Sequence, residues 1–184
     1  ALADYTYEIR ELTPDEVAPF LEAREFEGIN VTIPYKEKVI PYLDEISDAA
    51  RKIGAVNTVK KVEGRLIGDN TDFYGMREMI LRAGIEIKHK KVLILGTGGA
   101  SKAVCYALRR LGIETQYVSR TAREGILSYD ELTPELMAQY TVIVNTTPLG
   151  MHPKVDECPP LDYTLLTSQH LLYDVIYNPA KTLF

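Results

Sequence analysis

The chain has 184 residues, of which 46% are hydrophobic and 26% charged, and its formal net charge is −5. This composition is typical of a globular protein, and the length suits one domain or two small ones. The acidic balance and the lack of a basic tract argue against nucleic acid or an anionic membrane as the main partner. No apolar run approaches the roughly 20 residues that cross a bilayer, and no signal peptide is visible at the N-terminus.

The cysteines and histidines point to no special chemistry. Cys105 lies among apolar residues of an expected helix, and two cysteines, Cys105 and Cys158, make no disulfide framework. We therefore expect a reducing compartment, the cytoplasm. His89, His152 and His170 lack the spacing of metal ligands, so we expect no metal site.

The first half of the chain predicts a mixture of short strands and helices. Apolar and polar residues alternate from Asp4 to Leu12, which favours a half-buried strand. Thr13, Pro14 and Glu16 form a capping-box pattern, and the helix that they start is expected to run to about Arg24. The other expected elements are a strand over 29–33, helices over 36–43 and 48–53, a hairpin of 56–62 with 65–67, and a helix over 73–82 that Gly84 ends.

From Lys91 onward, apolar runs alternate with helical stretches. Strands are expected over 92–95, 115–119, 142–145 and 171–176, with a helix over 100–111 and a short helix that begins at Thr133. Strands separated by helices imply crossover connections and a parallel sheet. The sequence therefore predicts an α/β protein of two lobes, 1–72 and 73–184, with the helix over 73–82 as the connector.

A glycine-rich turn joins the strand over 92–95 to the following helix. Gly96 permits a tight turn, Gly98 leaves room for a pyrophosphate, and the first N–H groups of the helix face that anion. We predict that Gly96, Gly98, Gly99 and Ala100 contact a dinucleotide. Ser101 stands where the usual third glycine would fall, but it is small enough for close packing. The alternative is a tight strand-to-helix turn without a ligand.

The end of the next strand bears on the choice of dinucleotide. An NAD site usually places an acid about 20 residues after the glycines, where it binds the ribose 2′-hydroxyl. This chain has Ser119, Arg120 and Thr121 at that place instead. A guanidinium suits a phosphate, so we predict NADP rather than NAD. The alternative is that Arg120 is an ordinary surface arginine.

Six sequence blocks follow one another along nearly the whole chain: Asn30–Lys36, Gly54–Thr58, Gly68–Asp72, Gly96–Ser101, Asn145–Met151 and Asp174–Pro179. In this order they resemble the shikimate dehydrogenases, NADP-dependent enzymes that reduce 3-dehydroshikimate. Six blocks in the same order are specific where a single block would be weak. The resemblance implies a substrate-binding catalytic lobe in 1–72, a Rossmann-like NADP-binding lobe in 73–184 and a role in aromatic amino acid (chorismate) biosynthesis.

The resemblance implies that Lys36 and Asp72 are the catalytic pair. Reduction of a ketone requires a proton donor for the developing alkoxide, and an ammonium can supply that proton or orient the substrate. A neighbouring carboxylate can fix the ammonium and bind a substrate hydroxyl. Taken alone, Lys36 would be a solvated charge at a helix start, and Asp72 a helix N-cap.

The resemblance also implies further ligand contacts. Thr32 and Asn57 match the substrate-hydroxyl ligands of the family, and Tyr177 matches a position that lines the cleft. Asn145 and Thr146 are assigned to cofactor binding. Without the resemblance, Thr32 and Asn57 would form ordinary turn hydrogen bonds and Tyr177 would pack in the core.

Both ends of the family pattern are missing here. The family begins with a strand and a serine-bearing loop for the substrate carboxylate, and it ends with further sheet and a glutamine-bearing helix. The chain is then either a fragment or a natural short form, and we expect these 184 residues to be weakly active or inactive. A quinate/shikimate dehydrogenase and a non-catalytic NADP-binding or regulatory relative are the alternatives. The expected partner is a small-molecule substrate, and both a monomer and a homodimer stay open.

Overall fold

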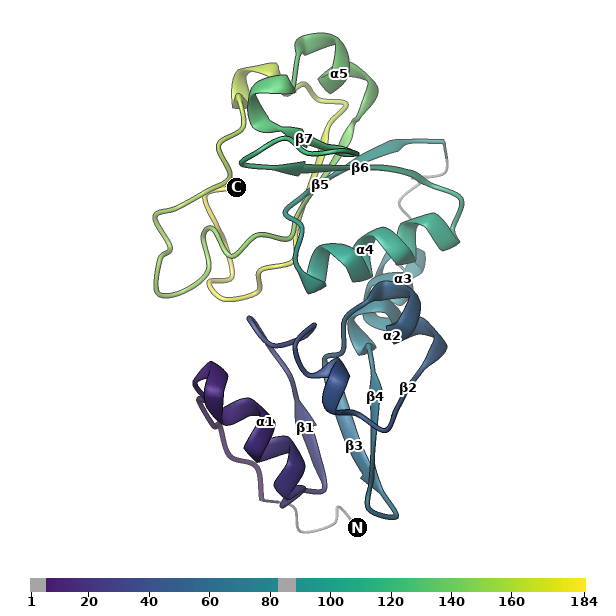
Figure 1. Ribbon diagram of the computed structural model, residues 1–184. Coiled ribbons are helices and arrows are strands. Elements are labelled where there is room, and N and C mark those ends of the chain that lie inside the picture. The colour runs from purple at the N-terminus through teal and green to yellow at the C-terminus, as the bar shows by residue number, and fades with distance from the viewer. Residues whose placement is uncertain (1–5, 83–88) are drawn as a thin grey trace.

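The computed structural model describes residues 6–82 and 89–184, which form two β-sheets with helices packed between and around them (Figure 1). The first sheet, built from residues before 70, is the front sheet, and the second is the back sheet. The helices are α1 (Pro14–Ala23), α2 (Asp48–Ile53), α3 (Thr71–Arg82), α4 (Gly99–Arg110) and α5 (Pro134–Gln139). The strands are β1 (Gly28–Asn30), β2 (Glu45–Ile46), β3 (Thr58–Val62), β4 (Arg65–Asp69), β5 (Lys91–Leu95), β6 (Glu114–Ser119), β7 (Ile126–Ser128), β8 (Val142–Asn145) and β9 (Leu171–Asp174).

The front sheet has the strand order β1-β3-β4-β2. β3 pairs antiparallel with both β1 and β4, and β2 pairs parallel with β4. The β3–β4 hairpin turns at Glu63 and Gly64, whose φ angles are 50° and 75°. Two successive positive φ values are typical of the tight turn that matches strand twist, so the predicted hairpin is confirmed.

The capping box that the sequence predicts for α1 is present. The Glu16 carboxylate accepts hydrogen bonds from the backbone N–H of Thr13 at 2.7 Å and from its hydroxyl at 2.8 Å. The helix ends at Ala23, and Arg24 follows in the left-handed conformation. Val17 and Leu21 turn the buried face of α1 toward the front sheet, so the helix covers part of the first core.

The strand predicted over 4–12 is wrong for the residues that the structure describes, 6–12, which carry no regular structure. Tyr7 and Ile9 are 76% and 89% exposed. The alternation of apolar and polar residues is real, but this segment lies across a groove of about 1130 Å³ from β1 instead of pairing with it. A strand requires a hydrogen-bonding neighbour as well as a pattern. The predicted stop at Gly84 lies outside the described residues.

Two other predictions for the first half are corrected in extent. The strand expected over 29–33 is shorter than predicted: it ends at Asn30, and residues 31–33 lead to Pro34 outside the sheet. The helix expected over 36–43 is a series of turns with a short 3₁₀ helix, Ile40–Tyr42. Pro41 lies inside this stretch and has no N–H to donate, which disfavours a regular α-helix here.

The back sheet confirms the predicted parallel arrangement. Its order is β7-β6-β5-β8-β9, and every adjacent pair runs parallel. Only the short edge strand β7 was not predicted. The chain moves outward from β5 in one direction through β6 and β7 and then in the other through β8 and β9. This reversal creates a switch point at the carboxyl ends of β5 and β8, where sheets of this type bind ligands.

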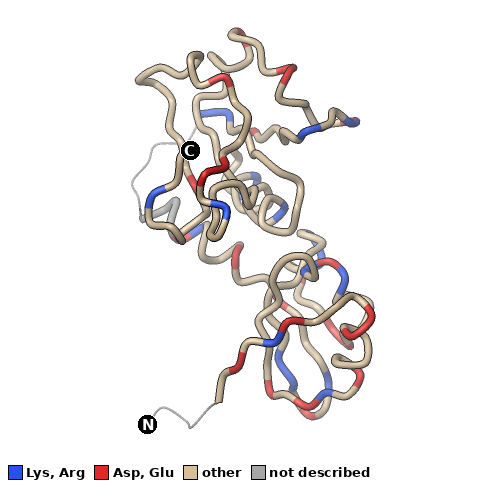
Figure 2. Tube along the Cα trace, turned by 90° about the vertical axis from the view of Figure 1, so that its left-hand side faces the viewer, with Lys and Arg blue, Asp and Glu red and all other residues tan. Residues whose placement is uncertain are grey.

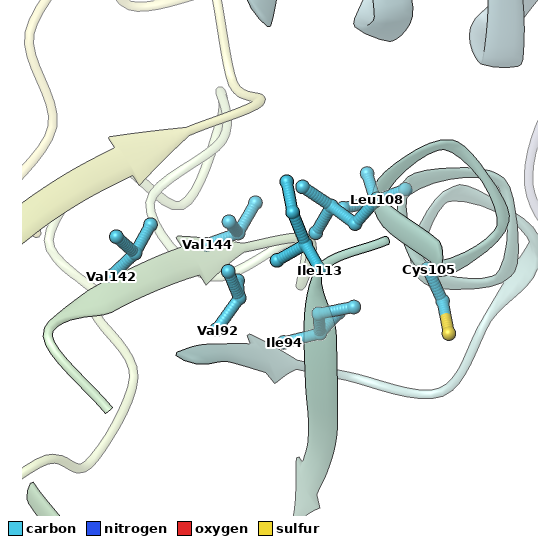
Figure 3. Close-up of a cluster of buried hydrophobic side chains, with 8 residues drawn as sticks. Val92, Ile94, Cys105, Leu108, Ile113, Val142 and Val144 are labelled. Carbon is cyan, nitrogen blue, oxygen red and sulfur yellow. The ribbon is translucent and has the colours of Figure 1, made fainter. Parts of the chain in front are cut away.

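The core of the back sheet explains the strongest apolar runs in the sequence. Val92 and Ile94 of β5 and Val142 and Val144 of β8 project to the same side, toward α4 and its residue Leu108 (Figure 3). These strand side chains are almost completely buried. Burial on both faces accounts for continuous apolar runs where a half-exposed strand would alternate.

Helices α3 and α4 pack against each other between the two sheets (Figure 1). Ala103 and Ala107 of α4 are fully buried against Ala55 and Phe73. Because these alanines are small, residues 55 and 73 can pack close to the backbone of α4. The ring of Phe73 lies 4.9 Å from that of Tyr106. The boundary between residues 72 and 73, and a separate role for each lobe, stay predictions.

Acidic and basic residues are interleaved along the described chain (Figure 2), as the absence of a basic tract in the sequence leads one to expect. Within residues 6–82 and 89–184, no helix is long and apolar enough to cross a membrane. The same residues contain no group of three or more potential metal ligands.

Candidate active site

The glycine turn lies at the switch point of the back sheet. Gly96 has φ = 105°, a value that favours glycine, and its N–H donates to the Val118 carbonyl at 2.8 Å. A Cβ at Gly96 would lie 3.1 Å from the Thr146 hydroxyl oxygen, and that hydroxyl donates to the Leu95 carbonyl at 2.5 Å. The ends of β5 and β8 are therefore fastened together, and Thr146 is engaged in holding them.

The first turn of α4 has the open space and the lack of acidic side chains that suit an anion. Gly98 is the N-cap residue, and a Cβ at this position would meet no atom within 4 Å. The first turn carries no acidic side chain, so its free N–H groups are not neutralised by the protein. Ser101 is fully buried and donates its hydroxyl to the Gly98 carbonyl at 2.6 Å. A serine is thus accommodated where the usual pattern has a glycine, and Ala100 beside it is half-buried.

Lys36 and Asp72 form the ion pair that the sequence predicts. The Lys36 Nζ lies 2.6 Å from the Asp72 Oδ2, and the two side chains are 15% and 40% exposed. They come from the turn after Pro34 and from the first turn of α3. Asp72 is inside the helix and does not cap it, because the Asn70 Oδ1 accepts from the Phe73 N–H at 3.3 Å. Asn70 is therefore the N-cap.

The ion pair lies beside the glycine turn, although the two belong to different sheets. A Cβ at Gly99 would be 3.1 Å from the Lys36 Cδ and 3.2 Å from its Cβ. The aliphatic stem of Lys36 therefore runs directly over the first residue of α4. A second contact lies one turn further along this helix, where the Lys102 Nζ pairs with the Glu37 carboxylate at 2.7 Å. Such close approach brings a charged pair to the predicted dinucleotide site.

Asn57 and Thr32, the expected substrate ligands, differ in their surroundings. The Asn57 Oδ1 accepts from the Thr71 N–H at 2.8 Å, and its Nδ2 donates to the Thr71 hydroxyl at 3.0 Å. Asn57 is 9% exposed and holds the start of α3 in place, which uses one of its two amide hydrogens. Thr32 is exposed at the end of the segment that leads to Lys36.

The remaining predicted residues are spread around the carboxyl edge of the back sheet. Asn145 is fully buried, and its side chain donates to Asp174 at 3.2 Å and accepts from the Thr147 hydroxyl at 2.7 Å. It therefore shapes the loop after β8. Tyr177 is 91% exposed, so the alternative of a core tyrosine is wrong.

The predicted recognition site for the ribose phosphate lies at the end of β6. Ser119 pairs with Ser128 of β7, and Arg120 and Thr121 follow in an exposed loop. Burial raises the pKa of Tyr129 to about 12, and the positive charge of Arg120 opposes that rise. Arg120 itself is an exposed residue.

Sequence reasoning missed two features of the site. Asn70 was one of four consecutive cap-forming residues, Asp69–Asp72, and nothing in the pattern favoured it over its neighbours. The contact of Gly99 with the Lys36 stem joins residues that are far apart in the chain. No local pattern carries such a signal.

Comparisons with known proteins agree with this geometry. A family model described as the shikimate dehydrogenase substrate binding domain matches residues 2–59. A shikimate dehydrogenase (NADP(+)) of Carboxydothermus hydrogenoformans is 47% identical over 178 residues, which cover 89% of this chain and 64% of that protein. One of Clostridium beijerinckii is 39% identical, with 97% and 69% covered. The solved shikimate 5-dehydrogenase of Thermus thermophilus, in complex with NADP(H) and shikimate, is 34% identical with a TM-score of 0.73, and the match covers 90% of this chain and 64% of that one.

A doubly wound parallel sheet, a smaller mixed sheet and a charged pair beside the glycine turn define an α/β protein with a nucleotide-binding type of architecture. The similarity to the Clostridium beijerinckii protein extends over more than two thirds of that relative. The chain belongs to the shikimate dehydrogenase family. It spans less than two thirds of the length of the Carboxydothermus hydrogenoformans relative.

Proposed function

We propose that this protein catalyses the reversible, NADPH-dependent reduction of 3-dehydroshikimate to shikimate in aromatic amino acid biosynthesis. The observation that carries the proposal is the Lys36–Asp72 pair, whose charged atoms lie 2.6 Å apart, with the stem of Lys36 packed over the first residue of α4. A protein that only binds a dinucleotide has no need for an ammonium and a carboxylate held together at that place. The names of its relatives, and the NADP(H) and shikimate bound in the Thermus thermophilus structure, agree with this reaction.

NADP fits the residues at the carboxyl edge of the back sheet. The open space over Gly98 and the free N–H groups of α4 suit a pyrophosphate, and Gly96, Gly99 and Ala100 complete that turn. Ser119, Arg120 and Thr121 would hold the 2′-phosphate, since a guanidinium binds a phosphate dianion well. Asn145 and Thr146 would shape the loop beside the nicotinamide. When bound, NADPH supplies the hydride that reduces the ketone.

The proton chemistry falls to the front half of the protein. In the direction of reduction, the Lys36 ammonium gives a proton to the alkoxide oxygen that forms from the ketone, and solvent then reprotonates the amine. In the reverse direction, the neutral amine takes the proton of the substrate hydroxyl. Asp72 keeps the ammonium in place and accepts a hydrogen bond from a neighbouring substrate hydroxyl. A positive charge close to the developing oxyanion also lowers the barrier electrostatically.

Substrate recognition uses groups that surround the pair. We propose that Thr32 and the second amide hydrogen of Asn57 bind the ring hydroxyls, since hydroxyl and amide groups suit a polyhydroxylated substrate. Tyr177 is exposed and would contribute its phenol from the loop after β9. The substrate-binding lobe is then 1–72 and the NADP-binding lobe 73–184.

The test follows the absorbance of NADPH in the presence of 3-dehydroshikimate. We expect Lys36→Met to lower kcat by roughly 10² to 10⁴-fold, the usual contribution of an acid–base group. Lys38→Met is the matched control, because Lys38 is an exposed lysine of the same turn and lies over the Tyr35 ring. Equal kcat values for the two variants would refute the assignment of Lys36.

A parallel set of measurements separates the alternatives. Quinate, offered beside shikimate for oxidation, distinguishes a quinate/shikimate dehydrogenase. Ligand protection against thermal unfolding without turnover would indicate a binding or regulatory relative. Intact-mass measurement of the purified chain should accompany each assay, so that activity is assigned to a defined polypeptide.

We also propose a cytoplasmic location and either a monomer or a homodimer. Cys105 and Cys158 are both free thiols, and Cys105 is buried, which suits a reducing compartment. Fractionation of cells and sedimentation of the purified chain test the two statements.

A further inference from the structure

Asn70 is a fully buried polar residue at the start of α3, and its side chain makes two hydrogen bonds with separate parts of the chain. Its Oδ1 accepts from the Phe73 N–H at 3.3 Å, which caps the helix. Its Nδ2 donates to the Ala55 carbonyl at 3.0 Å. A helix cap needs only the acceptor, and serine or aspartate would supply one equally well. The amide donor therefore does something besides capping.

The segment that Asn70 contacts, Ala55–Asn57, also holds the lysine of the ion pair. The Val56 N–H donates to the Lys36 carbonyl at 2.7 Å. The Asn57 Oδ1 accepts from the Thr71 N–H, one residue before Asp72, at 2.8 Å. The backbones of Lys36 and Asp72, 36 residues apart, are thus fixed to the same three residues. Ala55 is itself buried against α4, so this segment is well supported.

Asn70 attaches the start of α3 to Ala55 from the buried side of the helix. Asn57 binds the backbone immediately before Asp72, while Asn70 binds the residue immediately after it and ties that turn to Ala55. With both bonds in place, the Asp72 backbone is held on either side. Loss of the amide donor would leave a buried carbonyl without its partner and would release one of these two attachments.

We propose that Asn70 is a positioning residue for the Lys36–Asp72 pair: its bond to the Ala55 carbonyl sets where the carboxylate of Asp72 lies relative to the ammonium of Lys36. The catalytic consequence rests on the proposed function. The geometric consequence does not, because the state of the ion pair can be measured without turnover.

The main variant is Asn70→Ser, which keeps a capping oxygen but has no group that reaches the Ala55 carbonyl. Asn70→Asp is the second variant, since it keeps the acceptor and exchanges the amide donor for an oxygen. Thr133→Ala is the matched control, because Thr133 is the N-cap of α5 and accepts from the Leu136 N–H at 3.3 Å. It removes a cap of the same kind from a helix that does not carry the pair.

The first measurement is the rate at which Lys36 is labelled by reductive methylation, followed by peptide mass spectrometry of the full 184-residue chain. Asp72→Asn gives the rate for a lysine whose carboxylate partner is lost. We expect Asn70→Ser to raise the Lys36 rate about threefold or more toward that limit, because the network that holds the pair is coupled. Thr133→Ala should leave the rate unchanged.

The second measurement separates kcat from cofactor binding. We expect Asn70→Ser to lower kcat about tenfold through a small displacement of the acid–base pair, with the Kd for NADPH unchanged. Unchanged Lys36 labelling in both folded Asn70 variants would overturn the proposal. So would loss of folding in both while Thr133→Ala folds, since Asn70 would then act only in stability. If Lys36→Met and Lys38→Met have equal kcat values, the proposed function fails, and the labelling rates still decide the role of Asn70.

Discussion

Two adjacent glycines at the start of α4 should have separable functions. Gly98 faces open space, and its backbone conformation, φ −82° and ψ −172°, is one that alanine adopts. Gly99 faces the stem of Lys36, and a Cβ there would lie 3.1 and 3.2 Å from two of its carbons. Alanine at position 98 therefore intrudes on the predicted pyrophosphate site, whereas alanine at position 99 intrudes on Lys36, the proposed proton donor.

The size of the Gly99→Ala effect follows from these distances. Carbon atoms pack best about 3.5–4.0 Å apart, so the Lys36 stem must move by about 0.5 Å. A misplacement of about 1 Å can cost 10²-fold in rate, which suggests a loss of about tenfold in kcat. Overpacking costs about 1–3 kcal/mol and helix propensity returns about 0.8–1.0 kcal/mol. The net loss of at most about 2 kcal/mol should lower Tm by no more than about 8 °C.

The assay compares Gly98→Ala and Gly99→Ala in the same preparation. Fluorescence titration with NADPH should show weaker binding for Gly98→Ala by about tenfold or more, because its methyl group removes space beside the helix N-terminus. Turnover at saturating NADPH should fall for Gly99→Ala. Two variants with the same pattern of Kd and kcat would refute the reasoning, as would a Gly99→Ala protein with the kcat of the parent.

Three further predictions concern the cofactor, pH and the core. Arg120→Ala should raise the Kd for NADPH by about 10 to 100-fold, which is the loss expected for a charge-assisted hydrogen bond, and should leave NADH binding unchanged. Equal NADPH affinity of the variant and the parent in titration would refute the choice of NADP. The backbone N–H of Leu66, and then Arg24, hold the pKa of Asp44 below 3.8, so the stabilisation that this carboxylate gives is complete above pH 3.8 and is lost as pH falls through the lowered pKa. The gap in urea midpoint between the parent and Asp44→Asn should therefore be greatest near neutral pH and close in acid, and a gap independent of pH would contradict this cause. Leu93→Ala, at a fully buried position in β5, should cost about 2–5 kcal/mol in urea unfolding, and a cost below about 1 kcal/mol would show that the site can collapse.

The sequence predicts well those elements that are determined by a local pattern of residues. β5 and β8 are buried on both faces and read as unbroken apolar runs, and α1 has its capping box. The segment over 6–12 alternates like a strand, but whether a neighbour lies within hydrogen-bonding reach is decided elsewhere in the chain. β7 has three residues in a polar stretch and pairs only at the edge of the sheet. A pattern so short carries too little information.

The candidate site also contains features that the sequence predicts and features that it does not. Lys36 and Asp72 came from the family resemblance, and the structure brings them together at 2.6 Å. Their individual binding roles stay predictions. The cap at Asn70 was hidden because its neighbours are equally good caps, and three-dimensional contact with Ala55 decides between them. The nearness of Gly99 to Lys36 depends on how two sheets meet, which no local pattern contains.

The Lys36 backbone and the backbone beside Asp72 are both attached to Ala55–Asn57, and this has a consequence for motion. If the two sheets rock against each other during turnover, the ammonium and the carboxylate travel as one rigid unit, because both are attached to the same segment of the front half. In the proposed reaction, the position of the proton donor relative to its carboxylate would then not depend on such rocking, whereas the distance to a dinucleotide on the back sheet would.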